Sequence, residues 1–110
     1  MTKQVFLGEF ELVVLLAVLR LGDEAYGVTI MREIEERTGR RASRGAVYIT
    51  LERLEKKGYL KSHFADPTPE RGGKAKRYFK IESLGVRALR DSGRALSGMW
   101  SGLEQVLGRL

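Results

Sequence analysis

The fold is decided by residues 43–81, which read SRGAVYITLERLEKKGYLKSHFADPTPERGGKAKRYFKI. The first part of this stretch predicts a helix, because Val47, Leu51 and Leu54 recur at the spacing of one helical face. Ser43 stands just before this pattern, where a serine side chain favours the start of a helix. We therefore expect one face of this helix to be buried and the opposite face to remain free for a partner.

Two short β-type segments, residues 59–64 and 77–81, follow the point where Gly58 ends the helical pattern. Between them, residues 71–77 read RGGKAKR, in which cations surround a glycine pair suited to a tight turn. A basic hairpin tip of this kind can grip phosphate groups. A helix followed by a basic hairpin is the layout of a winged helix-turn-helix, so the sequence predicts a mainly α (α+β) fold with a two-stranded wing.

The distribution of charge supports a polyanionic partner. The chain carries 20 Lys or Arg against 14 Asp or Glu, a formal net charge of +6. Four arginines without an acid among them lie at the start of the predicted helix: Arg37, Arg40, Arg41 and Arg44. Cations that neutralise phosphates release condensed counterions, which favours nucleic acid as the partner. The alternative interpretation of the arginines is a solvated charge run.

Two helices are expected before this unit. Residues 10–21 are apolar on almost every side, which predicts a helix buried in the centre of the fold or at an interface. A second, amphipathic pattern carries Ile30, Met31 and Ile34 on its apolar face and ends at Gly39, which is expected to form a left-handed cap.

Residues 83–110 carry a heptad pattern that predicts a C-terminal dimerisation helix. Its two sets of positions, seven residues apart within each set, are Leu89, Leu96, Leu103 and Leu110, and Val86, Gly93, Trp100 and Leu107. A stripe with this period packs against a partner helix. We therefore expect a homodimer, with a DNA-binding part at residues 1–82 and a dimerisation helix at residues 83–110, within one compact domain.

Four blocks of the sequence together resemble the PadR family of transcriptional regulators. These blocks are LGEFEL at 7–12, AYG at 25–27, GAVY with LERLEKKG at 45–58, and RGGKAKRY at 71–78. The resemblance implies a winged helix-turn-helix repressor of bacterial or archaeal type that dimerises through its terminal helices and binds an inverted-repeat operator. Many members are released from DNA by small aromatic or drug-like molecules. Ile49 and Thr50 depart from the family's proline-containing pattern, so its base preference is not carried over.

The expected site residues fall into two groups. Those expected to contact DNA are Arg41, Ser43, Arg44, Tyr48, Ile49, Arg53, Arg71, Gly72, Gly73, Lys74, Lys76 and Arg77. Those expected at the dimer interface are Leu89, Leu96, Trp100, Leu103, Leu107 and Leu110, with Trp100 also a candidate contact for a small aromatic effector. Two alternatives stay open: Tyr48 could pack its ring on the hairpin, and Trp100 could simply fill the core or the dimer seam.

Catalysis and metal binding are not supported by the sequence. The chain has no cysteine and a single histidine, His63, within an alternating strand, so neither a thiolate zinc site nor a histidine pair can form. No cofactor is expected, because a P-loop and a dinucleotide fingerprint are both missing from the sequence. The longest apolar run, residues 12–19, is far shorter than the roughly 20 residues that span a bilayer, so a cytoplasmic protein without a membrane partner is expected.

The sequence therefore predicts a dimeric, sequence-specific DNA-binding transcriptional regulator, a repressor released by a small ligand, with palindromic double-stranded DNA as its partner. The main alternative is a winged-helix protein-protein adaptor that does not bind DNA. A third option is coating of nucleic acid without sequence preference. A steep salt dependence of duplex binding would separate the first function from the adaptor, and competition by unrelated DNA would identify the third.

Overall fold

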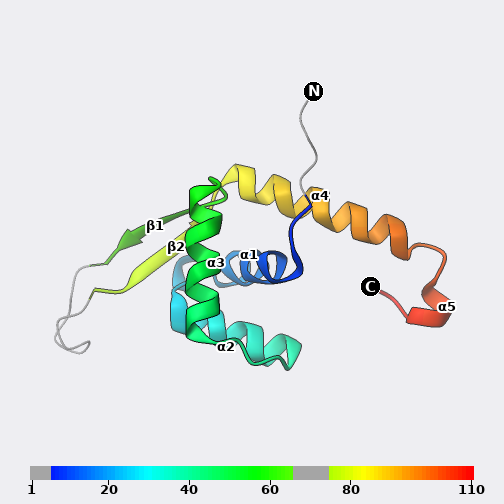
Figure 1. Cartoon of the computed structure of the whole chain (residues 1–110), viewed down its shortest axis with the longest axis horizontal. Helices are drawn as coiled ribbons and strands as arrows, with labels where there is room; N and C mark the ends of the chain where they lie inside the picture. Colours follow the sequence, from blue (N-terminus) through cyan, green and yellow to red (C-terminus); the bar gives the residue numbers. More distant parts are fainter. Residues whose placement is uncertain (1–5, 66–74) are drawn as a thin grey trace.

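The computed structural model describes residues 6–65 and 75–110, where three helices surround one apolar core and carry a hairpin on one side (Figure 1). In chain order the elements are α1 (Glu9–Leu21), the 3-10 turn η1 (Gly22–Glu24), α2 (Gly27–Thr38), α3 (Arg44–Lys56), β1 (Leu60–Phe64), β2 (Arg77–Ile81), α4 (Ser83–Trp100) and α5 (Glu104–Leu107). The hairpin projects from one end of the molecule and the far end of α4 projects from the other (Figure 1). The predicted mainly helical fold with a two-stranded sheet is confirmed.

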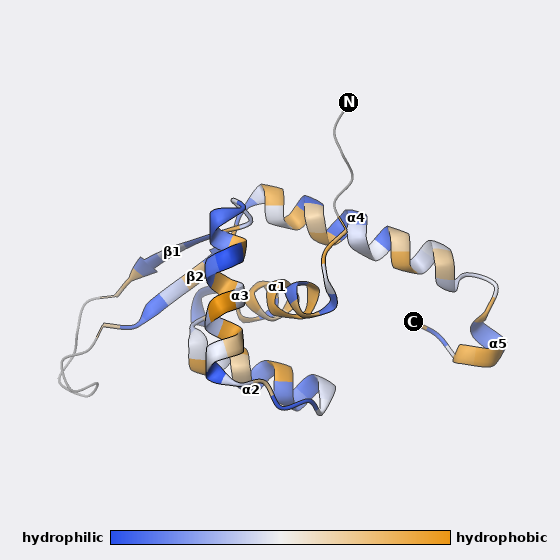
Figure 2. Ribbon diagram, viewed as in Figure 1, coloured by the Kyte–Doolittle hydropathy of each residue, from blue (hydrophilic) through white to orange (hydrophobic). Residues whose placement is uncertain are grey.

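The core is built from the apolar faces of α1, α2 and α3, closed by β2. Its fully buried large side chains are Val14, Leu15, Val18, Ile30, Val47, Leu51, Leu54 and Phe79. Most residues of α1 are apolar, whereas α2 and α3 each carry both apolar and polar residues (Figure 2). Each buried side chain of this size contributes about 1.5–3 kcal/mol relative to exposure. The three residues whose spacing predicted the third helix are therefore core residues.

Local signals set the ends of the helices as the sequence predicts. The Ser43 side chain accepts a hydrogen bond from the backbone N–H of Ala46 at 3.1 Å and so caps α3. Gly39 adopts φ 71°, the left-handed conformation that ends α2. These two caps fix the loop that brings Arg40 and Arg41 next to the first turn of α3.

The wing is an antiparallel pair of strands in a defined register. Leu60 lies opposite Ile81 at its base and Phe64 lies opposite Arg77 at the last described rung. An isolated antiparallel bridge between Tyr26 and Tyr78 connects the wing to the residues before α2. The sheet is thereby tied to the segment that leads into α2.

The first half of α4 packs tightly against the core. Gly85, Ala88 and Ser92 are its buried residues, and the Ser92 hydroxyl accepts a hydrogen bond from the Leu7 backbone N–H at 3.0 Å. A Cβ at Gly85 would lie 2.4 Å from the Tyr59 carbonyl oxygen, so only glycine allows this approach.

The prediction of one continuous helix from residue 83 to residue 110 is wrong beyond Trp100. Ser101 leaves the helical conformation at ψ 128°, Gly102 adopts φ 93°, and the chain turns back into the short α5. The Trp100 indole N–H then donates a 2.7 Å hydrogen bond to the Gly108 carbonyl. Glycine adopts positive φ easily and favours the helix poorly, so local backbone chemistry outweighs the heptad spacing here.

None of the helices in residues 6–65 and 75–110 combines the length and the hydrophobicity needed to cross a membrane.

Candidate nucleic-acid interface

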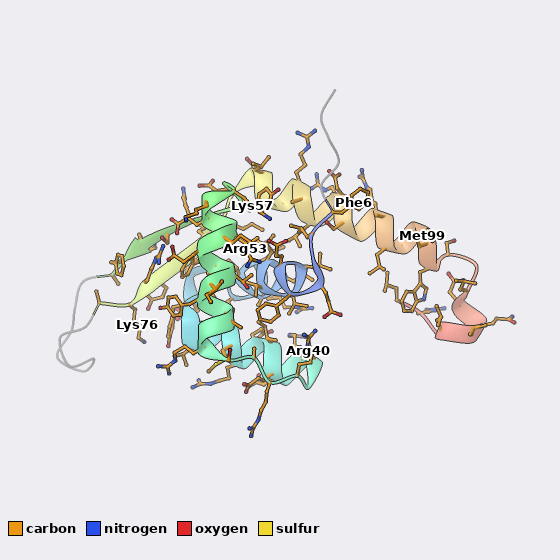
Figure 3. All side chains as sticks on the ribbon, in the orientation of Figure 1. Phe6, Arg40, Arg53, Lys57, Lys76 and Met99 are labelled. Atoms are coloured by element: carbon orange, nitrogen blue, oxygen red, sulfur yellow. The ribbon has the colours of Figure 1, made fainter. Side chains whose placement is uncertain are left out.

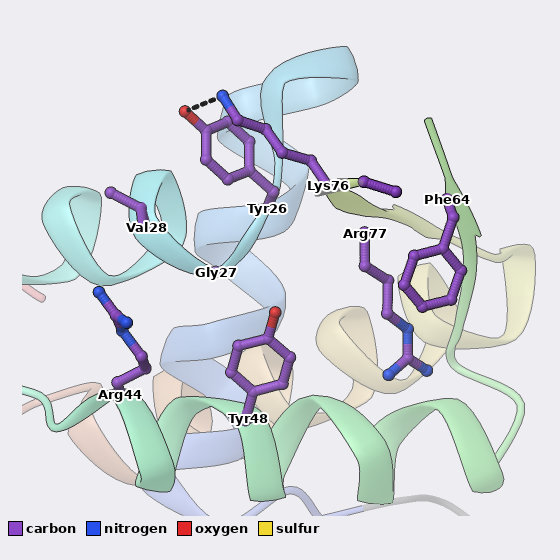
Figure 4. A pocket seen from close by; sticks show the side chains of 9 residues that line it. Tyr26, Gly27, Val28, Arg44, Tyr48, Phe64, Lys76 and Arg77 are labelled. Carbon is purple, nitrogen blue, oxygen red and sulfur yellow. Dashed lines mark hydrogen bonds between the residues drawn. The ribbon is translucent and has the colours of Figure 1, made fainter. Parts of the chain in front are cut away.

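A groove with a volume of about 340 Å³ lies between the start of α2, the outward side of α3 and the wing (Figure 4). Its lining residues are Tyr26, Gly27, Val28, Arg44, Tyr48, Phe64, Ala75, Lys76 and Arg77. Four of these, Arg44, Tyr48, Lys76 and Arg77, were predicted to contact DNA. The fold thus brings the predicted helix residues and the predicted wing residues to one surface.

The outward face of α3 is open to a partner. Gly45, Ile49, Glu52 and Lys56 are all exposed along it, and Ile49 is 62% exposed. Arg44 is the first residue of α3, and its side chain extends across the groove toward α2 (Figure 4). A helix N-terminus carries partial positive charge, so Arg44 adds to an electrostatic environment that already favours anions.

Tyr48 is held close to the first turn of α2. A Cβ added to Gly27 would lie 3.0 Å from Cε2 of the Tyr48 ring, so the missing side chain of Gly27 makes room for the tyrosine. The ring is half-buried and lines the groove, with its hydroxyl pointing away from α3 (Figure 4). Tyr48 therefore packs against the start of α2, and its ring also lines the groove.

Lys76 lies on the wing and reaches Tyr26. Its ammonium group donates a hydrogen bond of 3.1 Å to the Tyr26 hydroxyl and lies 4.2 Å from the centre of the Tyr26 ring. Tyr26 also makes an edge contact with Tyr78 at 5.3 Å between ring centres, and Tyr78 stacks on His63 at 5.7 Å. His63 is exposed within this aromatic row, as expected for a surface side chain.

Arg77 lies on the opposite face of the strand and contacts α3. It forms ion pairs with Glu52 and Glu55, and its side chain is only 20% exposed. Burial alone would lower the pKa of the Arg77 guanidinium, but the two carboxylates outweigh burial and raise the pKa. Glu52 and Glu55 are three residues apart on the predicted helix. This spacing was the available signal for their pairing with Arg77, and the sequence analysis missed it.

Arg53 lies away from the groove, on the side of α3 that meets α1 (Figure 3). Its guanidinium is 3.9 Å from a Glu11 carboxylate oxygen, which also accepts a 2.9 Å hydrogen bond from Lys57. Partial burial would raise the pKa of Glu11, but Lys57, the Gly8 backbone N–H and Arg53 lower it overall. The fold therefore does not bring Arg53 together with the groove residues.

The remaining predicted DNA contacts differ in their positions. Arg41 is exposed in the loop before α3, and Ser43 uses its hydroxyl to cap the helix. The arginine cluster is partly paired, because Arg40 forms an ion pair with Glu9. Four wing-tip residues lie outside the described part of the chain: Arg71, Gly72, Gly73 and Lys74.

Five groove residues were not among the predicted DNA contacts, namely Tyr26, Gly27, Val28, Phe64 and Ala75. Phe64 is 68% exposed at the last described rung of the wing. An aromatic residue at the outer end of an alternating strand was the available signal for it. Tyr26 and Val28 enter the groove only because tertiary packing places the start of α2 beside α3.

The predicted dimer residues do not form one stripe. Leu89 packs partly against the core of its own chain, whereas Leu96, Leu103, Leu107 and Leu110 are exposed. A second groove, of about 500 Å³, lies between the N-terminal segment and the far half of α4, where Phe6 and Met99 are exposed (Figure 3). In the far half of α4, the exposed large apolar side chains are thus Leu96 and Met99.

A comparison with models of known protein families identifies the family to which the chain belongs. Residues 15–91 match the transcriptional regulator PadR-like family, which covers more than half of the chain. The chain therefore belongs to this family, as its sequence blocks predict. The family is one of transcriptional regulators and not of enzymes, which agrees with the sequence analysis.

Solved structures share the fold at low sequence identity. A PadR family transcription regulator from hypervirulent Clostridium difficile is 23% identical, with a TM-score of 0.73 over 92% of this chain and 100% of that one. A PadR family transcriptional regulator from Eggerthella lenta is 24% identical, with a TM-score of 0.68 over 89% and 83% of the two chains. A winged-helix DNA-binding protein from STIV is 13% identical, with a TM-score of 0.68 over 88% and 97%. The curated proteins include no significant match to the sequence.

Proposed function

We propose that this transcriptional regulator binds double-stranded DNA through α3 and the wing. The observation that carries the proposal is the groove, in which Arg44 of α3 and Lys76 of the wing line one surface, while Ile49 is exposed on the same helix. A DNA major groove admits an α-helix, and cations on both sides of it can hold the phosphate backbone. An adaptor that never meets DNA would have no use for this grouping of cations.

Individual contacts follow from the positions of the side chains. Arg44, Tyr48 and Ile49 lie on the side of α3 that would enter the major groove, so they are the proposed base contacts. Ser43 holds the first turn of α3 and leaves its backbone near the phosphates, while Arg41 supplies charge before it. The proposed backbone contacts on the wing are Lys76 and the wing-tip residues Arg71, Gly72, Gly73 and Lys74. Arg53 is proposed only as an outer phosphate contact, because it lies toward α1.

Dimerisation is proposed through the far half of α4 and the N-terminal segment. Leu96 is 43% exposed, Met99 is 79% exposed and Phe6 is 70% exposed around one apolar groove. A second copy could cover these side chains and remove their apolar surface from water. Two-fold symmetry would then require a palindromic operator with half-sites about one helical turn, roughly 34 Å, apart.

The proposed regulation is repression relieved by a small aromatic ligand near Trp100. The indole N–H is engaged by the Gly108 carbonyl, so such a ligand would meet the ring rather than its polar edge. A ligand shifts a two-state equilibrium only by its difference in affinity for the two states. Titration of planar aromatic compounds, followed by Trp100 emission and operator affinity together, tests this part. Regulation by such ligands is excluded if a broad panel changes neither signal.

Selection of bound duplexes from random and genomic DNA tests the proposal as a whole. For a cytoplasmic regulator of this kind, we expect the selection to enrich a palindromic sequence. The affinity of the protein for this duplex should fall steeply as the salt concentration rises. Footprints without dyad symmetry would contradict the dimer arrangement. Binding that unrelated competitor DNA erases would indicate coating without sequence preference, and no binding at low salt would favour the adaptor.

A further inference from the structure

Arg77 occupies a special position between the two parts of the interface. It stands opposite Phe64 in the last residue pair of the two strands. Its side chain turns inward to α3, as the close view of the groove shows (Figure 4). The same residue therefore belongs to the wing by its backbone and to the helix by its contacts.

Each of the three guanidinium nitrogens of Arg77 donates a hydrogen bond within the protein. Nη1 pairs with Glu52, Nη2 donates to Glu55 Oε1 at 2.6 Å, and Nε donates to the Ser62 hydroxyl at 3.0 Å. Ser62 in turn donates to the Glu55 carboxylate, whose oxygens lie 2.8 and 2.9 Å from the hydroxyl. We call these four residues, Glu52, Glu55, Ser62 and Arg77, the clasp. It joins α3, β1 and β2 in one network.

The clasp leaves Arg77 little charge for a phosphate. One guanidinium pairs with two carboxylates, so the net charge of these three side chains is negative in the absence of DNA. The group also lies 5.0 Å from the centre of the Phe79 ring and 5.8 Å from that of Phe64, so it is enclosed by apolar surface. Turning it toward DNA would remove the cation that pairs with Glu52 and Glu55 on α3.

The neighbouring residue holds the opposite face of the wing. Successive side chains of a strand point to opposite faces, and Lys76 accordingly reaches Tyr26, which directly precedes α2. The clasp thus ties the wing to α3 through several charge-assisted hydrogen bonds, whereas on the other face Lys76 makes one hydrogen bond to a neutral hydroxyl. Two elements that read one duplex together need a fixed relative placement, because an error of about 1 Å disrupts directed hydrogen bonds.

We propose that Arg77 is a positioning residue for recognition, in place of a direct DNA contact. Through the clasp it sets the angle between α3 and the wing, and so determines which base steps and which phosphates are contacted at the same time. This inference rests on the proposed DNA-binding function. It predicts that the clasp controls the preference for the operator over other DNA, and contributes little to the number of phosphates neutralised.

The test uses the full-length double variant Glu52→Gln/Glu55→Gln, which breaks the clasp and frees the Arg77 charge. Affinity for the selected operator and for an unrelated duplex is measured over a range of salt concentrations. We expect the ratio of the two affinities to fall about tenfold, through lost charge-assisted hydrogen bonds, even though the net charge rises by two. Arg77→Ala should lower the same ratio and leave the salt slope unchanged.

The matched control is Glu35→Gln/Glu36→Gln on α2, which raises the net charge equally without touching the wing. It should strengthen binding to both duplexes alike and keep their ratio. If the clasp variant behaves like this control, the clasp does not set the preference for the operator and the inference is overturned. If Arg77→Ala flattens the salt slope by about one unit, Arg77 contacts phosphate directly and the inference is overturned as well. If the wild-type protein prefers no duplex at all, the proposed sequence-specific DNA binding is wrong, and the inference about Arg77 is wrong as well.

Discussion

Two glycines of α4 should respond in opposite directions to the same substitution. At Gly85 a Cβ would lie 2.4 Å from the Tyr59 carbonyl oxygen and 2.9 Å from Ile81 Cγ1, whereas at Gly93 no heavy atom lies within 4 Å. Gly→Ala in a helix interior gains up to about 1 kcal/mol. Overpacking costs about 1–3 kcal/mol, and a cost near the upper end applies at Gly85 because a backbone carbonyl cannot rotate away. We therefore expect Gly85→Ala to destabilise the fold by about 1–2 kcal/mol net, and Gly93→Ala to stabilise it by up to about 1 kcal/mol.

The measurement is thermal and urea unfolding of the wild type and the two variants. For a chain of this size we expect the melting temperature to fall by roughly 4–8 °C with Gly85→Ala and to rise by a few degrees with Gly93→Ala. Gly98→Ala is a second control, because Gly98 also has open space at its Cβ position. Equal stability of the Gly85 and Gly93 variants would refute the close approach of α4 to Tyr59.

Three further predictions concern single interactions. Ser43→Ala removes the cap of α3 and should cost about 1 kcal/mol in urea unfolding, while Ser43→Gly costs only a few tenths. The pKa of Glu11 is lowered in the fold, so its contribution to stability is present above the ordinary value of 4.5 and is lost as the pH falls through the lowered pKa. The Glu11→Gln variant should therefore lose less stability than the wild type between pH 7 and pH 3. An identical loss in both proteins would contradict the ion pair between Glu11 and Lys57. Lys76→Ala should weaken binding to all duplexes alike and reduce the salt slope by about one unit, and an unchanged slope would show that Lys76 stays on Tyr26 in the complex.

The far end of the chain shows where sequence reasoning fails. The heptad spacing of Leu96, Leu103 and Leu110 predicts a continuous helix, but Gly102 and Gly108 take positive φ and the chain reverses between them. A hydrophobic period reports which side chains could share a face, and it does not report whether the backbone continues. The conformational freedom of glycine decides that question locally.

Local and periodic patterns in the sequence are enough to predict the elements from α1 to β2 in order, and the buried face of α3. Val47, Leu51 and Leu54 are buried because an apolar stripe at helical spacing has only one way to leave water, and Ser43 and Gly39 act as caps through short-range chemistry. These are local or periodic properties, so they can be predicted from neighbouring residues alone.

Which of the cations remain unpaired depends on contacts between residues that are far apart in the sequence. Arg44, Lys76 and Arg77 are equally basic in the sequence, yet Arg44 stays exposed, Lys76 rests on Tyr26 and Arg77 is enclosed by the clasp. The partners of Lys76 and Arg77 lie 15 to 50 positions away along the chain, and the pairing depends on the twist and register of the wing. A charge in the sequence has no direction until the fold supplies its neighbours, and for this reason the roles of these three residues differ.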